Sequence, residues 1–102
     1  MTKGYWVVHV YVSDMEAYRL YVAAIKAPLT AYGARYLTRG GAFECPEGST
    51  KPRTVVIEFP SYEAALACYN GAGYAEAAKL RQAVATSDFI IVEGYDGPQP
   101  GD

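Results

Sequence analysis

The sequence predicts an α+β domain in which helices cover one face of a four-stranded antiparallel sheet. Three observations support this class. The chain has 102 residues, a length typical of one domain. Four segments are rich in Val, Ile and aromatic residues, as strands are. Two helical regions separate the first strand from the second and the third from the fourth. We assign residues 1–97 to a single domain and residues 98–102 to a polar tail.

The first expected strand covers residues 4–12, "GYWVVHVYV". Its Val and aromatic content favours β structure. Side chains alternate between the two faces of a strand. One face carries Trp6, Val8, Val10 and Val12. The other face carries Tyr5, Val7, His9 and Tyr11. Both faces are mostly apolar, so we expect both to become buried.

The first helical region follows directly. Ser13 and Glu16 have the spacing of a capping box, with Ser13 as the N-cap. Apolar residues then recur at steps of four, three, four and three, which is one helical face. They are Tyr18, Val22, Ile25, Leu29 and Tyr32. Pro28 should kink the helix or begin a second short one, and Gly33 should end it.

The middle of the chain predicts a β-hairpin. Residues 34–45 form the second expected strand, in which Gly40 and Gly41 are typical of a bulge or a sharp bend. Residues 46–52 contain the turn residues of a hairpin loop. Residues 53–59 form the third strand. One face of it carries Val55, Ile57 and Phe59, and the other carries Thr54, Val56 and Glu58.

The second helical region begins at Ser61, a favourable N-cap. "NGAG", residues 70–73, interrupts it because glycine opposes a helix interior, and the helix resumes over 74–86. We expect Cys68 to pack in the core and Lys79 and Arg81 to be solvated. Residues 88–95 form the last strand. We place Ile90 and Val92 on its helix-covered face and Phe89 and Ile91 on its open face.

The resulting order, β-α-β-β-α-β, is that of the ferredoxin-like fold. Its helices cover only one face, so the other face would leave an apolar patch larger than monomers usually expose. That patch would contain Tyr5, Val7, Tyr11, Leu37, Val56, Phe89 and Ile91. Two copies packed sheet to sheet would cover it. We therefore predict a homodimer.

Composition narrows the possible partners. The net charge is −2 and no basic cluster occurs, which disfavours nucleic-acid binding. One histidine, Cys45 and Cys68 are too few ligands for a structural zinc site, so we expect neither a metal nor a cofactor. No apolar stretch approaches the length of a membrane span, and the N-terminus does not resemble a signal peptide. We expect a cytoplasmic protein.

Ionisable groups are expected on the open face of the sheet. By alternation they are His9, Arg35, Arg39, Glu58 and Glu93. His9 and Glu58 lie near the middles of adjacent strands and are expected to meet. A carboxylate beside an imidazole fixes its tautomer and suits acid–base catalysis. Arg39 would hold an anionic group, with Tyr5, Tyr11 and Glu93 completing the binding site. A buried, mutually satisfied network without any ligand is the structural alternative.

Four segments together resemble a known bacterial family. They are "GYWVVHVYVSDMEAY", "YGARYLTRGGAFE", "PRTVVIEFPSYEAALACY" and "DFIIVEGYDG". Over residues 4–97 the chain resembles domain of unknown function 1330. The resemblance implies a dimeric α/β barrel, in which ferredoxin-like subunits pair through their sheets. That superfamily includes cofactor-free monooxygenases, muconolactone-type isomerases, haem-handling enzymes and ligand-sensing domains, so the fold does not choose a function.

Two functions therefore remain open, and whether the protein is an enzyme is open with them. The first is binding or conversion of a small, partly apolar anionic metabolite in the barrel interior. There His9 and Glu58 would act as acid and base and Arg39 would hold the anion. The second is a non-catalytic dimeric accessory or interaction module, whose polar cluster specifies pairing. A solvent pocket reaching His9 would favour the first.

Overall fold

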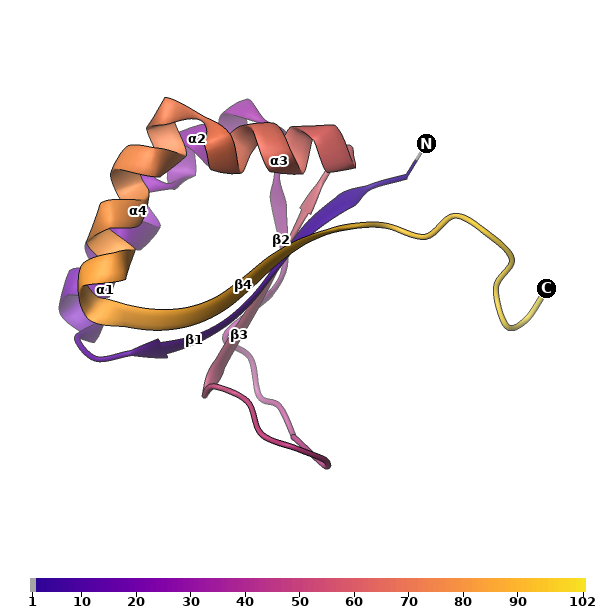
Figure 1. Cartoon of the computed structure of the whole chain (residues 1–102), viewed down its shortest axis with the longest axis horizontal. Coiled ribbons are helices and arrows are strands. Elements are labelled where there is room, and N and C mark those ends of the chain that lie inside the picture. The colour runs from indigo at the N-terminus through magenta and orange to yellow at the C-terminus, as the bar shows by residue number, and fades with distance from the viewer. Residues whose placement is uncertain (1) are drawn as a thin grey trace.

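The structure, a computed structural model, describes residues 2–102 and confirms the ferredoxin-like α+β class. In chain order the elements are β1 (Gly4–Val12), α1 (Met15–Ala24), α2 (Lys26–Ala31), β2 (Arg35–Arg39), β3 (Arg53–Phe59), α3 (Tyr62–Asn70), α4 (Ala72–Val84) and β4 (Ala85–Glu93). The strands lie in the order β2-β3-β1-β4, and all neighbours are antiparallel. The helices form one layer over the sheet, and the chain after β4 extends away from both (Figure 1).

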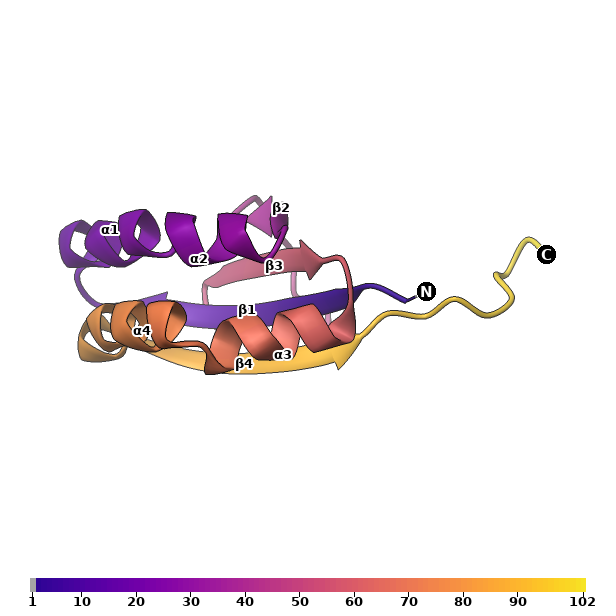
Figure 2. The same cartoon turned by 90° about the horizontal axis from the view of Figure 1, so that it is seen from above.

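The helical layer has two halves, with α1 and α2 along one side and α3 and α4 along the other (Figure 2). The first helical region divides at Ile25, and Pro28 lies in the first turn of α2. Of the two alternatives predicted at Pro28, the second short helix is the one that forms. Its N-cap differs from the prediction. The Asp14 carboxylate accepts the Ala17 N–H at 3.1 Å, whereas the Ser13 hydroxyl donates to the Val84 carbonyl. The Ser13 side chain therefore fastens the end of β1 to α4.

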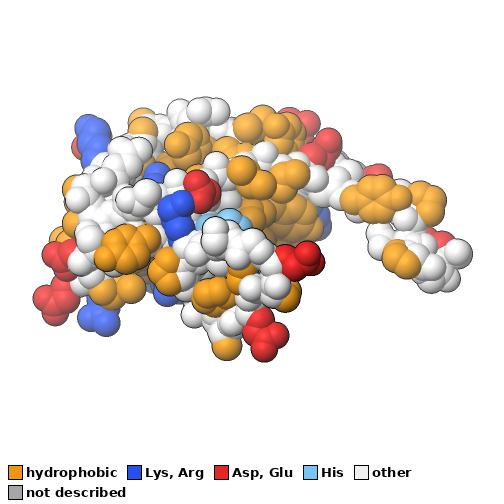
Figure 3. Space-filling view, turned by 60° about the horizontal axis from the view of Figure 1, so that its bottom comes forward, with side chains coloured by type: hydrophobic (Ala, Val, Ile, Leu, Met, Phe, Trp, Pro, Cys, Tyr) orange, Lys and Arg blue, Asp and Glu red, His pale blue; other side chains and the backbone are white. Residues whose placement is uncertain are grey.

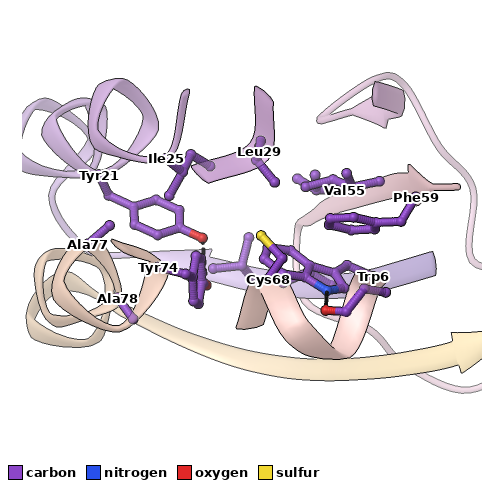
Figure 4. Packing of buried hydrophobic residues seen from close by; sticks show 14 of the residues in the cluster. Trp6, Tyr21, Ile25, Leu29, Val55, Phe59, Cys68, Tyr74, Ala77 and Ala78 are labelled. Atoms are coloured by element: carbon purple, nitrogen blue, oxygen red, sulfur yellow. Dashed lines mark hydrogen bonds between the residues drawn. The ribbon is translucent and has the colours of Figure 1, made fainter. Parts of the chain in front are cut away.

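The core lies between the two layers and is centred on Trp6, which is fully buried (Figure 4). Its indole ring lies 4.9 Å from the ring of Phe59 and 4.8 Å from that of Tyr74. The indole N–H donates to the Ala65 carbonyl at 2.9 Å. This single side chain thus joins β1 to β3 and to both helices of the second helical region.

The faces of β4 are the reverse of the prediction. Phe89 lies opposite Val8 and Ile91 opposite Trp6, so both residues face the helices. Ile90 and Val92 lie on the open face and are 56% and 41% exposed. The run "FIIV" contains no polar residue, so its hydrophobicity carries no alternation that could assign the faces.

β2 is shorter than the expected strand over residues 34–45, and its bulge lies at a different position. It ends at Arg39, and its pairing with β3 shifts between Tyr36 and Thr38. The bulge therefore lies at Leu37 and not at the glycine pair. Beyond it the alternation is displaced by one residue, so Arg39 lies on the same face as Tyr36.

The open face of the sheet carries an apolar surface in which the single histidine lies (Figure 3). Its side chains are half-buried or exposed. They are Tyr5, Val7, Tyr11, Val56, Ile90 and Val92. Over residues 2–102, every helix is too short or too polar to span a bilayer.

Candidate functional site: a cationic cleft beside the edge strand

The structure does not bring His9 and Glu58 together. β1 pairs with β3 so that Tyr5 lies opposite Glu58 and His9 opposite Thr54. Four residues along a strand separate His9 from the position facing Glu58, which is about 13 Å. The predicted contact is therefore wrong. The register follows the buried pairs on the helix face, such as Trp6 with Ile57.

His9 has other partners on the open face. Its Nδ1 lies 3.0 Å from the Thr54 hydroxyl oxygen. On the other side, β4 places Asp88 opposite His9. The Asp88 carboxylate forms an ion pair with Lys51. This open-face cluster of His9, Thr54, Asp88 and Lys51 lies on the surface through which a second subunit was predicted to pack.

The remaining predicted site residues are spread over both faces. Tyr5 and Tyr11 lie on the open face, as expected. Arg39 faces the helices, where its guanidinium carbon lies 4.5 Å from the centre of the Tyr36 ring. Glu93 lies opposite Gly4 at the end of β4 and accepts a hydrogen bond from the Thr2 hydroxyl. The single open-face site predicted from these residues is therefore not formed within this chain.

A cleft lies instead between α1, α2 and the edge strand β2. Its volume is about 440 Å³, which is within the usual range for small-molecule sites. It is lined by Val22, Ala23, Lys26, Leu29, Thr30, Ala34, Arg35, Tyr36, Arg39 and Ile57. Three of these are cations and none is an acid. The cleft therefore combines apolar walls with positive charge, although the chain as a whole is negatively charged.

Comparison with known proteins places the chain in a family. Residues 3–95 match the profile of a family described as Domain of unknown function (DUF1330). The chain belongs to this family. No curated protein matches it. The match covers every strand and helix, from Gly4 to Glu93, and so includes the cleft.

Solved structures similar to this DUF1330 chain share its fold. RPA0582, a protein of unknown function from Rhodopseudomonas palustris, is 19% identical with a TM-score of 0.75, over 94% of this chain and 85% of that one. SnoaB, a cofactor-independent oxygenase from Streptomyces nogalater, is 13% identical with a TM-score of 0.63, over 98% and 99%. A Bacteroides thetaiotaomicron protein named a possible oxidoreductase is 17% identical with a TM-score of 0.52, over 90% and 97%. At such low sequence identities, the structural similarity shows a common fold and nothing more.

The two cysteines of the DUF1330 chain differ in environment. Cys45 is exposed in the loop after β2, whereas Cys68 is a buried residue of α3, as predicted. Burial raises the pKa of the Cys68 thiol to about 11. The thiol is therefore protonated at neutral pH and packs as a small apolar group. A nucleophilic cysteine would instead need an accessible thiolate.

Sequence reasoning missed two cations that face the space between the layers. Lys26 lines the cleft from the start of α2, and Arg81, which was expected in solvent, is only 6% exposed on α4. A signal for Arg81 was present. It follows the buried residues Tyr74, Ala77 and Ala78 by seven, four and three positions, which places it on the same helical face.

Proposed function

We propose that this protein binds a small, partly apolar metabolite that carries a carboxylate, in the cleft between α1, α2 and β2. The observation that carries the proposal is the lining of this cleft, in which Lys26 and Arg39 are accompanied by no acid; Arg35 also lines it but lies opposite Glu58 on β3. Guanidinium groups bind carboxylates by paired, charge-assisted hydrogen bonds. The walls formed by Val22 and Leu29 would bury the apolar part of such a ligand.

Binding is better supported than acid–base turnover. The predicted acid–base pair, His9 and Glu58, is separated along the sheet, and neither residue lines the cleft. The similar fold of a cofactor-independent oxygenase is compatible with an enzyme, but fold alone does not assign a reaction. The cleft itself supplies positive charge and apolar surface, which are the requirements of a binding site.

We expect cyclohexanecarboxylate to bind and its neutral analogue cyclohexylmethanol to bind far more weakly. Lys26→Gln should weaken binding of the acid about three- to tenfold, because it removes an exposed cation that lines the cleft. Raising the salt concentration should also weaken it. Isothermal titration calorimetry measures all three effects. Arg19→Gln, an exposed change on α1 outside the cleft, is the control. Equal affinity for acid and alcohol would contradict the proposal.

We also propose that two copies pair through their open sheet faces. The exposed apolar side chains of this face support pairing, since Tyr11, Ile90 and Val92 are all more than two-fifths exposed in one subunit. In the pair, the open-face cluster of His9, Thr54, Asp88 and Lys51 would contact the sheet of the second copy. The cluster would then help to set the pairing geometry, which is the structural role considered above.

Ile90→Lys should convert the dimer to a monomer, because it places a charge in the middle of the apolar face. Leu20→Lys is the matched control, since Leu20 is 62% exposed on α1 and should not affect pairing. Multi-angle light scattering at micromolar concentration distinguishes the two masses. A monomeric wild-type protein, or an Ile90→Lys variant that remains dimeric, would rule out this interface.

A cytoplasmic location is part of the same proposal. Cys45 and Cys68 are both free in the structure. Free thiols of this kind persist in reducing compartments. An exposed thiol such as Cys45 fits such a compartment best.

A further inference from the structure

A second, smaller space lies deeper between the sheet and the helices. Its volume is about 20 Å³, enough for one water-sized group. It adjoins the cleft, because Val22, Tyr36, Arg39 and Ile57 line both. We call it the inner chamber. Its other walls include Trp6, Arg53 and Arg81.

Arginines from three elements line the inner chamber. Arg39 reaches it from β2, Arg53 from β3 and Arg81 from α4. No acidic residue is among its lining residues, and the ion pairs found in residues 2–102 involve other side chains. A guanidinium group taken out of water without an opposite charge costs considerable free energy. Arg81 is buried and Arg53 is half-buried, whereas Arg39 is exposed, so Arg81 and Arg53 place positive charge at the inner chamber that no acid neutralises.

The contacts of these arginines leave donors free. Arg81 donates to the Ser87 hydroxyl at 3.1 Å from Nη1, but its buried Nε has no hydrogen-bond partner. The buried Nε of Arg53 also has none. Aromatic rings lie near both groups, with the guanidinium carbon of Arg81 5.6 Å from the centre of the Phe89 ring. A ring face attracts a cation but does not satisfy an N–H in the plane of the guanidinium group.

The hydroxyl of Tyr18 is a further donor at this site. The Tyr18 ring lies 5.9 Å from the guanidinium carbon of Arg53. Burial raises the pKa of Tyr18, and the charge of Arg53 opposes that shift only in part. The phenol is therefore protonated at neutral pH and able to donate. The inner chamber thus presents several donors, and the acceptors around them are neutral hydroxyl groups, with no acid in its lining.

We propose that the inner chamber is an oxyanion subsite that takes the carboxylate of a monocarboxylic acid whose apolar body fills the cleft. Arg53, Arg81 and Tyr18 are its donors, and Arg39 lies where the two spaces adjoin. This proposal rests on the proposed function and adds the orientation of the ligand, with its charged end innermost. The small volume receives one oxygen of a planar carboxylate, whereas a tetrahedral phosphate needs more room.

The single tryptophan gives a direct readout, because Trp6 lines the inner chamber. Cyclohexanecarboxylate should change the Trp6 fluorescence in a saturable manner, whereas cyclohexylmethanol and inorganic phosphate should not. Arg81→Met should weaken binding of the acid at least tenfold, since a charged hydrogen bond is lost. It should also raise the melting temperature of the free protein, because it removes an uncompensated buried charge. Arg19→Met, exposed on α1, should change neither property.

Other outcomes would overturn the proposal. Unchanged affinity with a lower melting temperature in Arg81→Met would show that Arg81 only holds Ser87 and the aromatic rings. Phosphate binding as tight as that of the acid would refute the carboxylate assignment. If Arg81→Met does not fold, Tyr18→Phe keeps the ring and removes one donor. It should weaken binding severalfold, and unchanged affinity would overturn the proposal.

The proposal for the cleft and the proposal for the inner chamber can be tested separately. If Lys26→Gln weakens binding of the acid but Arg81→Met and Tyr18→Phe do not, the cleft binds the ligand and the inner subsite is wrong. If the wild-type protein shows no saturable binding of the acid up to about 10 mM, both proposals are wrong.

Discussion

Replacing Gly4 with alanine should destabilise the domain by about 3 kcal/mol, because the added methyl group has no room. A Cβ at Gly4 would lie 2.5 Å from the Ser61 carbonyl oxygen and 2.6 Å from the Tyr62 Cα. These are backbone atoms at the start of α3. They cannot rotate aside as a side chain would, so either β1 or the helix must move.

The displaced region matters for the rest of the fold. The Ser61 hydroxyl accepts the Ala64 N–H at 3.0 Å and caps α3, while the Ser61 carbonyl accepts the Ala65 N–H. Moving this turn would weaken the cap and shift Ala65, whose carbonyl accepts the hydrogen bond from Trp6. The effect of one methyl group therefore extends to the centre of the core.

Gly41→Ala is the matched control. A Cβ there would meet only the Thr38 hydroxyl oxygen, at an ordinary 3.7 Å. We expect its effect on the free energy of unfolding to stay within about 0.5 kcal/mol. Urea denaturation followed by Trp6 fluorescence measures both variants. Equal stability of the two variants would contradict the close approach of β1 and α3.

The fold could be predicted where residue patterns differ between the faces of an element. In β1, Trp6, Val8 and Val10 were correctly placed on the face that the helices cover. Ser61 was correctly identified as an N-cap. The prediction was wrong in β4, where Phe89 and Ile90 are equally apolar. Only the pairing with β1 decides their faces there.

The site could not be predicted because it depends on register and on one bulge. The bulge at Leu37 turns Arg39 from the open face to the helix face, and no glycine or proline occurs at that position to signal it. The distance between His9 and Glu58 depends likewise on the β1–β3 register, which the sequence of either strand alone does not specify. Arg39 was predicted to hold an anion, but its position near Arg53 and Arg81 was not predicted.

The buried tyrosine pair should make the protein unfold steeply in alkali. The hydroxyls of Tyr21 and Tyr74 are hydrogen-bonded at 2.8 Å between α1 and α4. Burial raises the pKa of Tyr21 above its ordinary value of 10.0, and Tyr74 reinforces the shift. Burial also raises the pKa of Tyr74, although its bond with Tyr21 and the charge of Arg81 oppose this. Both phenols therefore remain protonated in the folded protein when they would ionise in the unfolded chain.

The sign of the effect follows from proton binding. Below pH 10 both states hold these protons, and stability is fully retained. Above pH 10 the unfolded chain binds fewer protons than the folded one, so the free energy of unfolding falls as pH rises. Each phenol contributes a slope of about 1.4 kcal/mol per pH unit, so the pair contributes nearly twice that. Cys68 adds a loss that begins lower, near its ordinary pKa of 9.0, and ends near 11.

Urea denaturation at a series of pH values from about 8 to about 11 measures this slope. The double variant Tyr21→Phe/Tyr74→Phe removes both hydroxyls together, so it leaves no unpaired donor and should remain folded at pH 8. Its stability should fall much less steeply above pH 10. Tyr95→Phe, at a residue that is 70% exposed, should keep the wild-type slope. A double variant as sensitive to alkali as the wild type would show that the Tyr21–Tyr74 pair is not the cause. The alkaline loss would then arise from other groups, such as Cys68.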